Sequence, residues 1–162
     1  MHLVLVVKLL VLLTMANGTP VILKRVMSER TARPLDLGLR FPDGRPVFGP
    51  SKTIRGIIGA LAITTLAAPA LGLPWTAGLI VAVFAMLGDL FSSFTKRRLG
   101  LESGGMALGL DQIPESLLPF LALRGDLDLS ALDIVVGVVA FFVGELVLSR
   151  IFYWLGVRDR PY

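Results

Sequence analysis

The chain has 162 residues, of which 54% are hydrophobic and 17% charged, and its formal net charge is +4. Soluble proteins average about 45–50% apolar and about 25% charged residues, so this composition indicates an integral membrane protein. The absence of cysteine excludes disulfides and thiolate metal sites, and the single histidine, His2, excludes histidine metal triads and Ser-His-Asp catalysis. The basic residues lie in short segments between apolar runs, which is typical of membrane topology and argues against a nucleic-acid partner.

Five apolar segments are predicted to cross the membrane as helices, which makes residues 1–162 one all-α transmembrane domain. The predicted helices cover residues 1–16, 54–72, 74–95, 107–123 and 131–155. A crossing needs about 17–25 mostly apolar residues, which the third and fifth segments provide. The first segment is short enough to be a signal peptide, but it lacks a small-residue cleavage site and carries Lys8 near its middle, so we favour a retained helix. The fourth segment is polar and crosses only if its polar face is buried.

The charges between these segments predict the orientation. With five crossings, the loops 18–53 and 96–106 and the C-terminal tail share one side, and this side receives Lys24, Arg25, Arg30, Arg33, Arg40, Arg45, Lys52, Lys96, Arg97, Arg98, Arg158 and Arg160. The opposite side receives only Arg124. Because cytoplasmic loops carry the excess of Lys and Arg, we expect a multi-pass protein of the cell membrane with its N-terminus outside and its C-terminus in the cytoplasm.

The long loop 18–53 is predicted to hold a small β-hairpin. Leu35, Leu37, Leu39 and Phe41 alternate with polar or small residues, which is typical of a strand. Pro42-Asp43-Gly44 is a turn sequence, and residues 45–48 are placed to return as the second strand. A loop of this length in a compact protein is usually functional or disordered, and its periodicity argues against disorder.

Three acidic residues interrupt the third and fourth apolar segments. Asp89, Ser92 and Lys96 share one face of a helix, with Asp89 about 10 Å inside the boundary that Lys96 marks. Asp111 and Glu115 share one face of the next helix, with Asp111 about 9 Å inside the same boundary. Because the two helices are antiparallel neighbours, we expect the three carboxylates to meet at one depth near the cytoplasmic surface.

The meeting of three carboxylates indicates a metal site. In a medium of low dielectric constant they repel one another, and a divalent cation would remove that repulsion. Oxygen ligands without histidine or cysteine suit Mg²⁺, which keeps some of its water for substrate phosphates. Two other interpretations stay open, namely a proton relay or simple pairing of the carboxylates with Lys96 or Arg97. Glu145, in the middle of the fifth segment, either joins the acidic site or faces a partner helix.

The segment Phe48–Gly56, just before the second helix, is a candidate phosphate site. Small residues at a helix start leave backbone N–H groups free to bind phosphate, and Lys52 and Arg55 add positive charge. The spacing is not that of a P-loop. The alternative is a basic loop followed by an ordinary helix start.

These motifs together resemble a known enzyme family. Gly88-Asp89-x-x-Ser92-x-x-x-Lys96-Arg97, followed by Gly104-Gly105 and Leu110-Asp111, resembles the signature of the CTP-dependent phosphatidate cytidylyltransferases, and Gly49-Pro50-Ser51-Lys52-Thr53-Ile54-Arg55-Gly56 resembles a second element of that family. Pro34-Leu35-Asp36, Asp43-Gly44-Arg45 and Leu110-Asp111-Gln112-x-Pro114-Glu115 are most similar to its archaeal branch, the CDP-archaeol synthases. The bacterial enzymes have a histidine segment that this chain lacks, and Gln112 stands in place of an arginine, so those two functions are not carried over.

The resemblance implies a membrane nucleotidyltransferase of phospholipid biosynthesis. It would transfer CMP from CTP to an ether-linked isoprenoid glycerol phosphate, the unsaturated archaetidic acid, giving CDP-archaeol and pyrophosphate. It implies catalytic roles for Asp89, Asp111, Glu115 and Lys96, with Mg²⁺ held by the three acids, and substrate-binding roles for Lys52, Thr53, Arg55, Asp43, Gly44, Arg45, Ser92 and Arg97.

The expected partners are CTP, the lipid phosphate and membrane lipid, and a homodimer is left open. The alternative function is a proton- or cation-coupled transporter that uses the same acids. Against it, the chain shows no inverted repeat, and its polar residues cluster at one leaflet. A non-catalytic scaffold would leave the three intramembrane acids unexplained.

Overall fold

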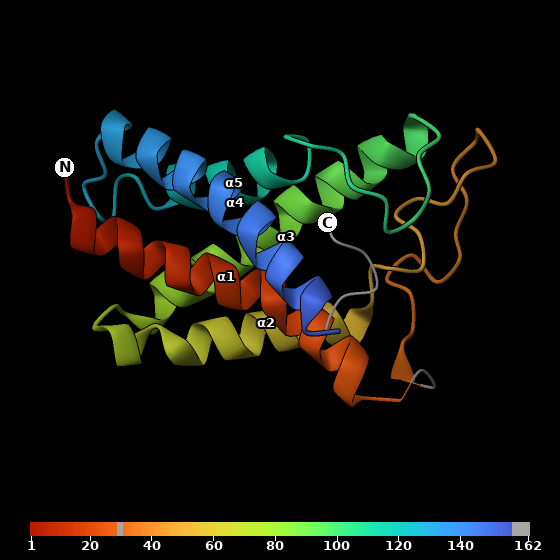
Figure 1. Ribbon diagram of the computed structural model, residues 1–162, viewed down its shortest axis with the longest axis horizontal. Coiled ribbons are helices and arrows are strands. Elements are labelled where there is room, and N and C mark those ends of the chain that lie inside the picture. Colours follow the sequence, from red (N-terminus) through yellow and green to blue (C-terminus); the bar gives the residue numbers. More distant parts are fainter. Residues whose placement is uncertain (29–30, 157–162) are drawn as a thin grey trace.

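The computed structural model describes residues 1–28 and 31–156, so Arg30, Arg158 and Arg160 of the basic set lie outside the described residues. Its elements are α1 (Leu3–Val26), α2 (Ile54–Ala67), the 3-10 turn η2 (Pro69–Leu71), α3 (Trp75–Arg98), α4 (Gln112–Ala122) and α5 (Ala131–Trp154). The helices form one bundle, and the loops 31–53 and 99–111 gather at one end of it (Figure 1). The predicted all-α fold class is confirmed.

Four helical stretches of the described chain are long and apolar enough to cross a membrane: Leu3–Val26, Ile54–Leu71, Trp75–Arg98 and Ala131–Trp154. A 24-residue helix is about 36 Å long, whereas the hydrocarbon core of a bilayer is about 30 Å thick. The outer face of α5 carries Val135, Val139, Val143 and Val147, four residues apart and each more than half exposed. Such a stripe suits contact with lipid rather than water.

The first helix is longer than predicted, because the residues expected to end it are helical. Gly18 and Pro20 lie inside α1, which continues to Val26. A Cβ on Gly56 would lie 3.1 Å from the Cβ of Pro20, so α2 approaches α1 through its glycines. Close approach through small residues is the usual contact between membrane helices. This packing holds the last turns of α1 helical although Pro20 cannot donate a backbone hydrogen bond.

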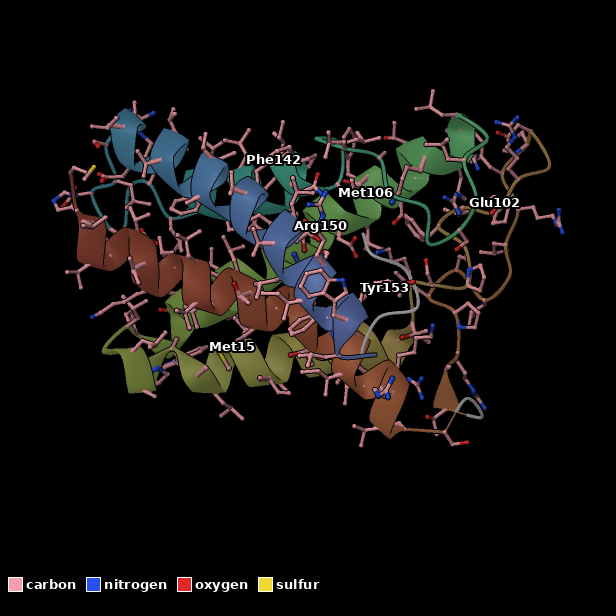
Figure 2. The ribbon with its side chains drawn as sticks, viewed as in Figure 1. Met15, Glu102, Met106, Phe142, Arg150 and Tyr153 are labelled. Atoms are coloured by element: carbon pink, nitrogen blue, oxygen red, sulfur yellow. The ribbon has the colours of Figure 1, made fainter. Side chains whose placement is uncertain are left out.

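The fourth helix is shorter than the predicted segment 107–123. α4 has 11 residues, about 16 Å, which is too short to span the membrane by itself. It begins deep in the bundle, because a Cβ on Gly88 of α3 would lie only 2.5 Å from the backbone of Pro114. Residues 99–111 therefore turn back along α3. In Figure 2, Glu102 lies among the loops, whereas Met106 lies further towards the middle of the molecule.

Side-chain hydrogen bonds explain why α4 starts late. The Asp111 carboxylate accepts the N–H of Ala107 at 2.8 Å, and the Gln112 side-chain oxygen accepts the N–H of Gly109 at 2.9 Å. Gly109 also has a φ of +80°, which interrupts a helix. The Ser92 hydroxyl of α3 donates to the Leu110 carbonyl at 2.5 Å. The irregular backbone is thus bonded within the protein, as membrane depth requires.

The loop between α1 and α2 contains the predicted turn but not the predicted strands. Phe41 N–H donates to the Arg45 carbonyl at 2.8 Å, and an isolated bridge pairs Arg40 with Pro46. No strand forms in the part of this loop that the structure describes. The alternating pattern fails because Leu37 has a φ of +49° and turns the chain, and because Pro46 has no N–H to continue a ladder.

At the other end of the bundle, hydrogen bonds connect the N-terminus to the start of α5. His2 N–H donates to Asp133 Oδ1 at 2.7 Å, and Ser130 forms a capping box with the same carboxylate. α1 packs against α2, α3 and α5, and α3 packs against α1, α2 and α4. The loops that carry most of the predicted site residues are left together at the opposite end.

Candidate active site

The loop-bearing end contains an ion pair between two distant parts of the chain. Lys52 Nζ lies 2.5 Å from Asp89 Oδ1 and 2.6 Å from Oδ2. Lys52 directly precedes Thr53, whose side chain caps α2, and Asp89 projects from α3. Burial opposes the charge of Lys52, but the carboxylates of Asp89, Glu115 and Asp111 outweigh this and raise its pKa above the usual value. The lysine is therefore held protonated.

A second ion pair joins α3 to the segment before α4. Lys96 Nζ lies 2.7 Å from Asp111 Oδ1 and donates to the Gly105 carbonyl at 2.9 Å. Lys96 is only 7% exposed, and a lysine tolerates such burial only with partners of this kind. The pair fixes residues 99–111 against α3. The pair also shows that α3 and the segment before α4 are neighbours, as predicted. Pairing of a carboxylate with Lys96 was one of the alternatives to a metal site that the sequence analysis kept.

Glu115 completes the group of acids. It lies in the first turn of α4 and is 3% exposed, and its Oε1 has no hydrogen-bond partner among the described residues. Glu115 lies close enough to Asp89, Asp111, Lys52 and Glu145 for their charges to interact. The three predicted carboxylates therefore share one region of the bundle, and Glu145 of α5 lies beside it.

The carboxylates do not form a ready-made metal cage. Within residues 1–28 and 31–156, no three His, Cys, Asp or Glu side chains are grouped closely enough to hold an ion. Two of the acids face lysines instead. The donors still fit Mg²⁺ in kind, because they are carboxylate oxygens and one of them, Glu115 Oε1, is buried without a partner. Joint binding of Mg²⁺ by Asp89, Asp111 and Glu115 stays a prediction.

The two basic loops lie against each other beside these ion pairs. Arg97 is 5% exposed and donates to the Glu102 carbonyl at 2.8 Å. Gly49, with a φ of +93°, is so close that an added Cβ would lie 3.5 Å from Arg97 Nη1 and 3.0 Å from the Ser103 hydroxyl. Ser103 also donates to the Ser51 hydroxyl at 3.1 Å. Both loops thus lie at one end of the bundle, as the sequence predicted.

The predicted substrate-binding residues of the long loop have partners outside the two ion pairs. The Arg45 guanidinium donates to the Arg98 carbonyl at 2.6 Å, and Asp43 Oδ1 lies 3.3 Å from Arg98 Nη1. Gly44 provides the positive φ of +76° that the turn between them needs. These contacts attach the turn to the C-terminal end of α3. Substrate binding by Asp43, Gly44 and Arg45 stays a prediction.

Arg55 and Ser92 likewise have structural contacts. Arg55 Nη1 donates to the Ser28 carbonyl and to the Thr31 hydroxyl, both at 2.7 Å, which ties the start of α2 to the chain that follows α1. Ser92 is buried and bonds the Leu110 carbonyl. Their direct contact with a substrate is therefore also left as a prediction.

Asp36, to which the sequence reasoning gave no separate role, organises the loop that carries Lys52. It is 6% exposed, its Oδ2 accepts the N–H groups of Phe48 and Gly49 at 2.9 Å each, and its Oδ1 accepts that of Gly38 at 3.1 Å. Burial raises the pKa of Asp36, but these backbone donors outweigh it and leave the pKa below the usual value. The Asp-x-Gly spacing is a local sequence signal for the hydrogen bond between Asp36 and Gly38. No local sequence pattern predicts the hydrogen bonds of Asp36 to residues 48 and 49.

Arg98 is a second residue whose role the sequence did not reveal. Its guanidinium lies 4.5 Å from the ring centre of Phe41 and 4.9 Å from that of Phe94, and the two rings meet edge to face. It also donates to the Pro46 carbonyl at 2.6 Å. Arg98 therefore fastens the long loop to α3, which a run of three basic residues does not reveal.

This fold and site define an integral membrane protein with one largely buried and one half-buried lysine–aspartate pair, and a buried glutamate, near the loop-bearing end of its helices. Family comparison goes further. The CarS-like family model, described as CDP-archaeol synthase, matches residues 2–162, and the chain belongs to this family.

Individual relatives agree with the family match. The chain is 47% identical over 104 residues to the CDP-archaeol synthase of Hyperthermus butylicus (60% of this chain, 59% of the relative) and 41% identical over 107 residues to that of Pyrococcus furiosus (60% of each). The matched part thus spans about three-fifths of these curated relatives. A solved structure described as an intramembrane enzyme for archaeal membrane lipids biosynthesis is similar with a TM-score of 0.73 and 33% identity, over 88% of this chain and 90% of that one.

Proposed function

We propose that this protein is a CTP-dependent cytidylyltransferase that transfers CMP to an ether-linked isoprenoid glycerol phosphate, giving CDP-archaeol and pyrophosphate. The observation that carries the proposal is the Lys52–Asp89 pair beside Lys96–Asp111 and Glu115, inside a bundle of membrane-spanning helices. The Lys52 and Asp89 side chains are 22% and 24% exposed, and in such a position a lipid headgroup would approach from the bilayer and a nucleotide from water. The family match and the similar intramembrane enzyme support this chemistry.

The reaction needs charge neutralisation more than proton transfer. An oxygen of the lipid phosphate attacks the α-phosphorus of CTP, the bond from that phosphorus to the α,β-bridging oxygen breaks, and pyrophosphate leaves with the electron pair. The attacking oxygen is already anionic, so no histidine base is required. The barrier lies in bringing two anions together and in the charge on the leaving group. Lys52, Lys96 and Arg97 are the buried or half-buried cations that would bind these phosphates.

Asp89 and Asp111 position two of these cations. Each aspartate holds its lysine within 2.7 Å, so the ammonium groups are in place before a substrate arrives. Mg²⁺ is the ion we propose for the site, and Asp89, Asp111 and Glu115 are the residues that would hold it. When bound, it would neutralise triphosphate charge and make the α-phosphorus more electrophilic.

The orientation follows from the charges at the two ends. The loop-bearing end carries Lys24, Arg25, Arg45, Lys52, Lys96, Arg97 and Arg98, and the positive-inside rule supports a cytoplasmic position for it in the cell membrane. CTP would then enter from the cytoplasm. The comparisons give the transporter alternative no support. A homodimer stays a prediction, which mass measurement of the protein in detergent will test.

The decisive experiment uses the purified protein in detergent with CTP labelled at the α-phosphate. We expect label to move into the organic phase only when an ether lipid phosphate and Mg²⁺ are both present, with one pyrophosphate released for each lipid labelled. An ester lipid phosphate in a parallel reaction measures the preference for the ether linkage. Absence of transfer to either lipid over a range of divalent cations would overturn the proposal.

A further inference from the structure

A cavity of about 220 Å³ lies between α1 and α5, beside the acidic site. The two helices cross in the bundle (Figure 1), and small residues at the contact, Gly18 and Gly144 among them, leave the space open. An added Cβ at either glycine would meet nothing within 4 Å. Because both helices are membrane spans and Val143 and Val147 on α5 are more than half exposed, the cavity lies where lipid surrounds the protein.

The cavity residues and the proposed catalytic residues lie at matching positions along their helices. Asn17 in α1 and Glu145 in α5 line the cavity, and Asp89 lies in the site; each is nine residues before the last residue of its helix. At 1.5 Å per residue, all three are about 14 Å from the ends of their helices. Glu145 also interacts electrostatically with Glu115 of the site. The cavity is therefore next to the site rather than a separate surface feature.

The polar groups in the cavity indicate what it would bind. Most of its lining is apolar, including Leu148 and Phe152, but Asn17 Nδ2 is a buried donor without a hydrogen-bond partner among the described residues. Such a donor is costly unless a ligand supplies an acceptor. The ether oxygens of a glycerol lipid accept hydrogen bonds and cannot donate them, so they match this amide. The charged phosphate would lie beyond this mostly apolar space, towards the cation Lys52 of the neighbouring site.

We infer that this cavity holds the uncharged neck of the lipid acceptor, namely its glycerol ether and the first part of its chains, with Asn17 donating to an ether oxygen. Pockets for whole ligands are usually about 300–1,000 Å³, so this smaller space suits a segment of a lipid whose chains continue into the bilayer. The lipid would enter sideways between α1 and α5. This inference rests on the proposed function, of which it names the lipid subsite.

Filling the cavity from each wall tests the inference. Gly144→Leu and Gly18→Leu place a side chain in open space, and Val147→Leu on the exposed face of α5 is the matched control. We expect both glycine variants to raise the KM for the ether lipid phosphate about tenfold or more. We expect the KM for CTP to stay within about twofold in all three variants. Asn17→Leu, which removes the donor, should raise the lipid KM about threefold to tenfold.

A binding measurement separates this inference from the proposed function. An ether lipid phosphate with a photoreactive group on its first isoprenoid unit should crosslink to residues 10–18 and 140–152, whether or not CMP is transferred. Crosslinks elsewhere, or a lipid KM for both glycine variants no higher than that of Val147→Leu, would overturn the cavity assignment. An equal rise in the KM for CTP would overturn it as well. If the wild-type protein transfers no CMP but crosslinks at these residues, the proposed function fails and the lipid subsite stands.

Discussion

Lys52 and Asp89 are 37 positions apart in the sequence, yet their side chains meet at 2.5 Å where the start of α2 passes α3. Neither residue would remain at this depth without the other, because an unpaired charge there is costly. The conformation of the long loop, which carries Lys52, therefore sets where this cation lies in the proposed site.

Removing the charge of Asp89 tests the role of this pair. Asp89→Asn keeps the size of the side chain but weakens its hold on Lys52, and we expect CMP transfer to fall about 100-fold or more. Asp126→Asn, an exposed acid at the opposite end, is the control and should leave the rate within about twofold. Transfer at the wild-type rate by a folded Asp89→Asn protein would remove Asp89 from the mechanism.

The Lys96–Asp111 pair should matter for stability. Lys96→Met leaves the carboxylate of Asp111 buried without its cation, and breaking one partner of a buried pair costs about 3–5 kcal/mol. We expect a clearly lower thermal midpoint in detergent, followed by the fluorescence of the two tryptophans. The double variant Lys96→Met/Asp111→Asn should recover part of the loss. Equal midpoints for the wild type and the single variant would show that the pair contributes nothing.

Gly88 should not tolerate even one added carbon. A Cβ at this position would lie 2.5 Å from the backbone of Pro114, which cannot rotate away as a side chain does. We expect Gly88→Ala to separate α3 from α4 and to cost about 1–3 kcal/mol, with a parallel loss of activity. Gly144→Ala, which meets nothing within 4 Å, should keep the thermal midpoint of the wild type or raise it. If the two variants melt alike, the close contact is not rigid.

The buried carboxylate of Asp36 predicts a dependence of stability on pH. Its pKa is lower in the folded protein than its usual 3.8, so its stabilising effect is present above that value and is lost as the pH falls through the folded pKa. Asp36→Ala should therefore lower the thermal midpoint at neutral pH. The difference from the wild type should shrink below pH 3.8. A difference that stays constant to lower pH would show that the contacts of Asp36 do not depend on its charge.

Labelling of single cysteines tests the orientation, because the chain has no cysteine of its own. Leu37 is 72% exposed in the long loop, and Asp126 is exposed at the other end. We expect a membrane-impermeant maleimide to label Asp126→Cys in intact cells and Leu37→Cys only after permeabilisation. The reverse pattern would place the site outside the cytoplasm and contradict the proposed entry of CTP.

Hydropathy and charge were enough to predict much of this protein. The apolar runs gave four of the membrane helices, and the bounds of α5 differ from the predicted 131–155 by a single residue. The basic loops were predicted at one end, and their contacts place them there. The helical spacing of Asp89 and Lys96 placed both on one face of α3, because the period of a helix fixes which side chains share a face. The helical path predicted from Gly105 to Asp111 was wrong, because residues 105–111 are irregular and α4 begins at Gln112.

Other features depended on contacts between distant segments. α1 continues past Gly18 and Pro20 because α2 packs against it, and α4 starts late because Asp111 and Gln112 bond the backbone before it. The hairpin is replaced by a loop held through Asp36 and Arg98. Which lysine pairs with Asp89 and which with Asp111 likewise depends on the tertiary structure. Local sequence sets which conformations a segment prefers, but the partners that satisfy its buried polar groups come from elsewhere in the chain, and in a membrane those partners decide the structure.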